Sequence, residues 1–181
     1  MGMTKSVFGK TSNGEVVHLV TVSNQKGMSI EVLDYGATLV SVNVPDKDGH
    51  TEDVALGYDD VLDYEKGDAY LGATVGRCGN RVDHAEFSIN GKEYFMEKNE
   101  GENVCHSGPR CYSRRMWDME LLEEENSVRF HLVSPNMDQG FPGTFEVTVT
   151  YTLTEENELK IHYNGTCDQD SLINMTNHSY F

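Results

Sequence analysis

The stretch FEVTVTYTL, residues 145–153, has the side-chain alternation of a half-buried β-strand. Every second residue is apolar, and Glu146 and three threonines stand between them, the apolar set being Phe145, Val147, Val149, Tyr151 and Leu153. Successive side chains of a strand point to opposite faces, so this pattern buries one face and leaves the other toward solvent. The stretch therefore predicts a strand that lies on a hydrophobic core.

Further strands are predicted on both sides of this one. After a turn at residues 155–157 the alternation resumes with Leu159, Ile161 and Tyr163, which predicts an antiparallel hairpin. A second hairpin is predicted over AEFSINGKEYFM, residues 85–96, because Asn90-Gly91 suits a type I′ turn. Shorter β-prone runs lie at residues 15–22, 28–33, 38–44 and 127–133, and the one predicted helix, of a turn or two, lies within 58–67. The fold class is therefore a single all-β domain, an antiparallel sandwich or barrel.

Composition narrows the function classes. The 181 residues correspond to about one domain. With 14 Lys plus Arg against 30 Asp plus Glu the formal charge is −16, which disfavours nucleic acid and anionic membranes as partners. No apolar run approaches the roughly 20 residues of a membrane span, and residues 1–10 lack the apolar region of a signal peptide, so neither a membrane span nor a secretory signal is expected. The four cysteines form no CxxC pair, so free thiols and a cytoplasmic location are expected. The seven histidines form no standard zinc spacing, so no metal is expected.

Two groups of polar residues stand out from the strands. GATVGRCGNRV, residues 72–82, places Arg77, Asn80 and Arg81 among glycines that let the backbone bend or approach a ligand. Arginine and asparagine together donate and accept as sugar hydroxyls require, although a glycine-rich turn with solvated arginines is the alternative for this segment alone. NHSYF, residues 177–181, would place His178 and Tyr180 on one face of a strand and Ser179 on the other. An imidazole there can exchange a proton near neutral pH.

With these motifs the chain resembles the aldose 1-epimerase, or galactose mutarotase, family along nearly its whole length. The similar segments follow the order of that family: LDYGATLVSVNVPDKDG (33–49), DVALGYDDVLDY (53–64), GRCGNRV (76–82), NVCHSG (103–108), QGFPG (139–143) and NMTNHSYF (174–181). The resemblance implies an antiparallel β-sandwich of the galactose mutarotase-like supersandwich type. It also implies that residues 1–181 are the N-terminal part of a single domain, incomplete here and truncated after Phe181.

The resemblance implies a reaction as well. The family interconverts the α and β anomers of hexoses such as galactose and glucose by opening and closing the ring. One group protonates the ring oxygen while another removes the proton of the C1 hydroxyl, so an acid and a base must lie on different sides of the sugar, without a cofactor. The expected ligand is a small-molecule aldohexose, and the expected assembly is a monomer or homodimer.

Residue roles follow from the same resemblance. His178 is the expected acid, and His106, in the loop NEGENVCHSGPR at residues 99–110, is expected to hold the substrate and polarise the same region. The other expected sugar-binding residues are Asn80, Arg81, Ser179 and Tyr180. The base of the family is a glutamate in its C-terminal part, beyond Phe181. Ser107 departs from the family, which has glycine there, and could shift His106 or narrow the loop.

Two rival hypotheses remain at this point. One is a non-catalytic carbohydrate-binding or sugar-phosphate-binding relative with the same fold. The other is a structural β-sandwich whose polar loops have no function. Clustering of Asn80, Arg81, His106 and His178 on one concave face would separate the structural hypothesis from the other two.

Overall fold

The N-terminal third of the chain forms the larger of the two main sheets. The structure is a computed structural model that describes residues 2–181. Five antiparallel strands follow one another in chain order: β1 (Gly2–Lys10), β2 (Val16–Ser23), β3 (Ser29–Leu33), β4 (Thr38–Pro45) and β5 (Thr51–Asp53). The β-prone runs of the sequence thus become neighbouring strands of one sheet.

The second sheet contains the strand predicted from residues 145–153. Its antiparallel order is β11 (Asp118–Leu122), β12 (Ser127–Ser134), β13 (Phe145–Leu153) and β14 (Leu159–Cys167). The five apolar residues of β13 are all buried, and the residues between them are not. The predicted β13–β14 hairpin is confirmed, with Tyr151 opposite Ile161 and Leu153 opposite Leu159.

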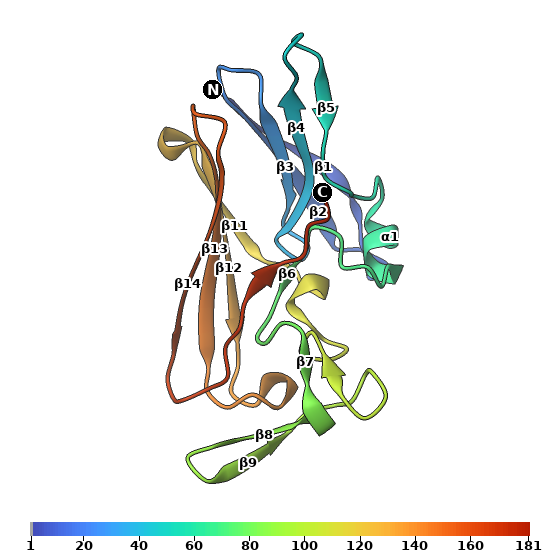
Figure 1. The fold of residues 1–181 in the computed structure, drawn as a ribbon, viewed down its shortest axis with the longest axis vertical. Coiled ribbons are helices and arrows are strands. Elements are labelled where there is room, and N and C mark those ends of the chain that lie inside the picture. Colours follow the sequence, from blue (N-terminus) through green and yellow to red (C-terminus); the bar gives the residue numbers. More distant parts are fainter. Residues whose placement is uncertain (1) are drawn as a thin grey trace.

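The two sheets share one hydrophobic core. Side chains of the first sheet, such as Val22, Ile30 and Leu39, belong to the same buried cluster as Phe130 and Val149 of the second. Burying apolar area between two sheets is the main stabilising contribution in a sandwich. Figure 1 shows both sheets in the upper and left parts of the molecule, with the short elements β7, β8 and β9 at the lower end. The predicted all-β, antiparallel sandwich is confirmed.

Helices are few and short. The predicted helix is α1 (Val61–Lys66), which buries Val61 and Tyr64. Asp60 is its N-cap residue, and the Asp60 carboxylate accepts a hydrogen bond from the Leu62 amide. The part of the chain that the structure describes also contains the 3₁₀ turns η1 (Asp83–Ala85), η2 (Tyr112–Arg114), η3 (Glu123–Glu125) and η4 (Asp138–Gly140). Within residues 2–181, no helix is long and apolar enough to cross a membrane.

The predicted Asn-Gly hairpin is also confirmed. It joins β8 (Glu86–Ile89) to β9 (Lys92–Phe95). Asn90 and Gly91 have φ angles of 54° and 76°, as the two central residues of a type I′ turn require. The hairpin projects at the lower end in Figure 1.

Residues 72–82 connect two distant parts of the chain. The first half of this segment contains β6 (Thr74–Val75), which pairs with β15 (Thr176–Asn177) near the C-terminus. Its second half contains β7 (Arg81–Val82), which pairs with β10 (Val104–Cys105). These two pairings bring together residues 72–82, the loop at residues 99–110 and residues 174–181, the three polar motifs of the sequence.

The C-terminal strand is shorter than the sequence predicted. The sequence analysis places residues 177–181 on a strand, whereas β15 covers only Thr176–Asn177. The Asn177 side chain explains the early end, because its Oδ1 accepts a hydrogen bond from the Ser179 amide, 3.0 Å away, and closes a local turn. Its Nδ2 donates to the Gly72 carbonyl and to the Tyr151 hydroxyl, so the turn is fixed to the core.

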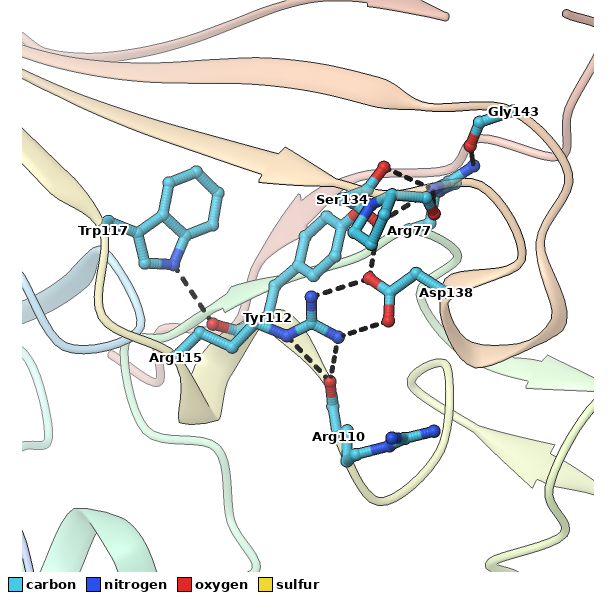
Figure 2. Close-up of polar contacts among 9 residues, drawn as sticks. Arg77, Arg110, Tyr112, Arg115, Trp117, Ser134, Asp138 and Gly143 are labelled. Atoms are coloured by element: carbon cyan, nitrogen blue, oxygen red, sulfur yellow. Dashed lines mark hydrogen bonds and ion pairs between the residues drawn. The ribbon is translucent and has the colours of Figure 1, made fainter. Parts of the chain in front are cut away.

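Arg77 lies in the core, so the alternative of solvated arginines is wrong for this residue. Its side chain is fully buried, and the guanidinium donates to the carbonyls of Ser134 and Gly143 (Figure 2). It also donates to the carbonyl of Pro142. The hydroxyl of Ser134 accepts another of its hydrogen bonds and donates in turn to Asp138, which also pairs with Arg115 (Figure 2). Arg77 thus fixes the glycine-rich motif to the β12–β13 connection.

Candidate functional site

A cavity of about 500 Å³ opens where the three polar motifs meet. Its lining includes His106, His178, Tyr180 and Arg81. These residues come from segments up to about half the chain apart, and the pairing of residues 72–82 with both β10 and β15 brings them together. A cavity of this size is in the range of small-molecule sites, typically about 300–1,000 Å³.

His106 lies directly after β10 and is held by the glycine-rich motif. Its backbone amide donates to the Asn80 carbonyl (3.0 Å), and the Asn80 amide donates to His106 Nδ1 (3.1 Å). Because Nδ1 accepts this bond, the neutral ring carries its proton on Nε2. Burial lowers the pKa of His106, and the neighbouring His178 and Arg81 lower it further, with Glu100 opposing them. His106 is therefore a neutral hydrogen-bond donor at neutral pH.

His178 belongs to the C-terminal motif, residues 174–181, and lies just after β15. Its backbone is fixed on both sides, since its amide donates to the Ala73 carbonyl and its carbonyl accepts from the Gly72 amide. Its ring centroid is 5.0 Å from that of His106, with the ring planes at 89°. Among residues 2–181, no side chain or backbone group makes a hydrogen bond to the ring nitrogens of His178. This imidazole is thus available to exchange a proton with a ligand in the cavity.

Tyr70 supports both imidazoles, and the sequence analysis missed it. Its ring centroid is 4.8 Å from that of His106 and 5.7 Å from that of His178. Tyr180 contacts His178 from another direction, at 5.3 Å. Aromatic neighbours at these separations restrict the orientation of an imidazole. No sequence motif marks Tyr70, and only its place two residues before Gly72 connects it with the glycine-rich segment.

Arg81 reaches the cavity from β7 and is paired with a second residue that the sequence analysis missed. Its Nε and Nη2 donate to the two carboxylate oxygens of Glu100, which also lines the cavity. Each partner shifts the pKa of the other, raising that of Arg81 and lowering that of Glu100. On the far rim, Arg114 contacts Asp68, Nη2 to Oδ1 at 3.4 Å. Nothing in their sequence positions distinguishes Glu100 and Asp68 from the many other acidic residues.

Two predicted residues lie beside the cavity and do not line it. The Asn80 side chain accepts from the backbone amide of Arg81 (2.9 Å) and lies near Arg81 Nη1 (3.4 Å), so its contacts are with the motif itself. Ser179 is not among the residues that line the cavity, and its Oγ is buried with no partner among residues 2–181. Direct sugar contacts by these two side chains stay a prediction.

The Ser107 substitution is accommodated away from the cavity. Its hydroxyl accepts from the Cys78 amide (2.8 Å) and donates to the Cys78 carbonyl (2.9 Å), which ties the His106 loop to the glycine-rich motif. Ser107 is almost fully buried and is not among the residues that line the cavity. Its side chain therefore anchors the loop.

The arrangement has the groups needed for proton exchange with a polyhydroxylated ligand. One imidazole is a neutral donor, the other has free ring nitrogens, and Arg81 lines the same cavity. Within residues 2–181, no group of three or more His, Cys, Asp or Glu side chains is arranged to hold a metal ion. The chain is therefore a β-sandwich protein with a cavity of small-molecule size that two imidazoles line.

Sequence comparison identifies the family. The aldose 1-epimerase family profile matches residues 18–181. The chain is 43% identical over 169 residues to an aldose 1-epimerase of Haemophilus influenzae. This alignment covers 93% of the chain and 48% of that protein. It is 36% identical over 183 residues to a galactose mutarotase of Sus scrofa, covering the whole chain and 52% of that protein. The chain belongs to the aldose 1-epimerase family.

Solved structures agree in fold. The galactose 1-epimerase of Lactobacillus acidophilus matches with a TM-score of 0.88 at 28% identity, over the whole chain and 53% of that structure. A homologue of aldose epimerases from C. elegans matches with a TM-score of 0.83 at 37% identity, over 88% of the chain and 49% of that structure. The chain spans about half the length of the curated relatives that it matches.

Proposed function

We propose that the whole protein is an aldose 1-epimerase, an isomerase that interconverts the α and β anomers of an aldohexose such as galactose or glucose. The observation that carries the proposal is the meeting of His106 and His178 in one cavity, with their ring centroids 5.0 Å apart. Family membership supports the same reaction. Of the rival hypotheses, the purely structural sandwich gives no reason for this clustering.

In this proposal His178 is the general acid. It protonates the ring oxygen as the ring opens, while a base removes the proton of the C1 hydroxyl. Rotation about the C1–C2 bond and closure on the other face then reverse both transfers. The free ring nitrogens of His178 and the ring contacts of Tyr70 and Tyr180 support this role, because the acid must be both available and oriented.

His106 has a different role. With Nδ1 bonded to the Asn80 amide, its Nε2–H can donate to the ring oxygen or to a nearby hydroxyl of the sugar. Because burial lowers the pKa of His106, this residue stays a neutral donor at a pH at which a solvent-exposed histidine begins to take up a proton. Such a donor stabilises the charge that develops as the ring opens and does not compete with His178 as the acid.

The general base is proposed to lie elsewhere in the whole protein. The cavity has two carboxylates among residues 2–181, Glu100 and Asp68, and both are engaged with arginines. The pairing with Arg81 lowers the pKa of Glu100, which makes this carboxylate a poor proton acceptor. We also propose a monomer or homodimer that acts in the cytoplasm, where the four free cysteines would stay reduced.

Polarimetry tests the proposed function. The whole protein is added to freshly dissolved α-D-galactose, and the approach of optical rotation to its equilibrium value is compared with a buffer blank. Acceleration in proportion to the protein concentration supports the epimerase. Binding of galactose with no acceleration would instead favour the non-catalytic carbohydrate-binding relative. The same comparison with α-D-glucose tests the breadth of substrates.

A further inference from the structure

Each arginine that lines the cavity contacts a carboxylate. Arg81 contacts Glu100, and Arg114 contacts Asp68. His106 adds no charge at neutral pH because its pKa is lowered by burial. In the part of the chain that the structure describes, the cavity therefore has no arginine or lysine without an acidic partner, although arginine is the side chain best suited to bind phosphate or carboxylate.

The contact with Glu100 leaves some N–H groups of the Arg81 guanidinium free to bind a ligand. A guanidinium has five N–H groups in a plane. Glu100 accepts from Nε and from Nη2, and the Asn80 oxygen lies 3.4 Å from Nη1. The outer edge formed by Nη1 and Nη2 is left to donate to a ligand. Two neighbouring hydroxyl oxygens can accept from such an edge, while the charge of the guanidinium is already compensated.

The position of Glu100 is fixed by its own loop. Glu100 and Asn103 exchange backbone hydrogen bonds across a tight turn. Asn99 ties this turn to β10, since its Oδ1 accepts from the Cys105 amide (2.7 Å) and its Nδ2 donates to the Cys105 carbonyl (3.0 Å). The turn therefore keeps the carboxylate in a constant position relative to Arg81 and to His106, the residue after Cys105.

We propose that Glu100 is a specificity-determining residue of the sugar site, which orients Arg81 for hydroxyl groups and excludes anionic sugars by compensating its charge. The proposal rests on the proposed function and adds a residue that selects the substrate class. A sugar carrying a carboxylate or phosphate loses the attraction of Arg81 and meets the repulsion of Glu100. The formal charge of −16 on the chain acts in the same direction at longer range.

The test compares three ligands by calorimetry at low salt: D-galactose, D-galacturonate with one negative charge, and galactose 6-phosphate with about two. In Glu100→Gln, we expect galacturonate affinity relative to galactose to rise about three- to tenfold, and that of the phosphate to rise further. The rise in relative affinity should increase with the charge of the ligand and should become smaller near 0.5 M salt. Loosening of the loop alone would produce neither effect.

Two variants serve as controls. Glu102→Gln removes an acidic residue of the same loop that pairs with Lys98 and does not line the cavity, and it should change the ratios less than twofold. Glu100→Asp keeps the charge and should keep the preference for galactose. Unchanged ratios in Glu100→Gln, or equal shifts in Glu102→Gln, would overturn the inference and leave the epimerase proposal standing. Failure of the unmodified protein to bind galactose would overturn both.

Discussion

Replacement of Arg77 by methionine tests whether the glycine-rich motif depends on a buried cation. Methionine keeps much of the apolar stem and removes the guanidinium. In the structure that group makes six contacts with oxygen acceptors, between 2.8 and 3.4 Å, from Ser134, Pro135, Pro142, Gly143 and Ser171. Most of these acceptors are buried, so water cannot easily replace the lost donor.

The expected cost follows from these contacts. A buried polar group left without its partner costs about 1–3 kcal/mol, and losses within one network do not add fully. The guanidinium also lies over the rings of Phe141 and Phe145, at 5.6 and 5.5 Å from the centroids. Taking the network as a unit, we expect Arg77→Met to lower the free energy of unfolding by about 3–5 kcal/mol, a large share of a typical 5–15 kcal/mol.

Urea denaturation followed by tryptophan fluorescence measures this loss, because Trp117 is buried and donates to the Tyr112 carbonyl beside the network (Figure 2). With a slope of roughly 2 kcal/mol per molar urea, the midpoint should fall by about 1.5–2.5 M. Arg81→Met is the matched control, since Arg81 belongs to the same motif and its side chain is 57% exposed. A midpoint change in Arg77→Met no larger than that of the control would refute the reasoning.

Three other predictions concern the site. Arg81→Ala should weaken galactose binding about ten- to a hundredfold in calorimetry, because a charged donor is lost, while the urea midpoint stays close to that of the unmodified protein; unfolding of the variant would instead make Arg81 structural. His106 should titrate below its ordinary 6.5 in NMR, since burial disfavours its charged form. Between that lower pKa and 6.5 the unfolded state binds more protons, so the contribution of His106 to stability is complete above pH 6.5 and decreases as the pH falls through this window; a titration midpoint at or above 6.5 would contradict the assigned environment. The 181-residue chain alone should leave the mutarotation rate at that of the buffer blank, because Glu100 and Asp68 are engaged with arginines, and clear acceleration would show that the base lies within these residues.

Local patterns were enough to predict most of the fold. The alternation of residues 145–153 predicts β13 because a strand with this pattern buries all its apolar side chains on one face. Asn90-Gly91 predicts a type I′ turn because both residues adopt positive φ angles readily. The end of β15 could not be predicted in the same way. The Asn177 side chain ends the strand by a local turn with the Ser179 amide, but the contacts that hold this side chain, to Gly72 and Tyr151, come from residues distant in sequence.

The site was only partly predictable for the same reason. The resemblance to a family selected His106 and His178, and the structure brings them into one cavity. Tyr70 was missed because its contact with His178 spans more than a hundred residues of sequence. Arg77 and Arg81 look equivalent in the motif, but only the tertiary structure shows that one lies in the core and the other at the cavity.

The most direct measurement for the central claim is the turnover of His178→Asn in the whole protein, followed by polarimetry of α-D-galactose together with calorimetry of galactose binding. Asparagine is similar in size and still forms hydrogen bonds, but it cannot deliver a proton to the ring oxygen. General acid catalysis contributes a factor of about 10² to 10⁴, so turnover should fall within that range while galactose still binds. In the matched variant His106→Asn, affinity should fall more and turnover less. Turnover in His178→Asn within a few-fold of the unmodified enzyme, with galactose bound normally, would contradict the assignment of His178 as the acid.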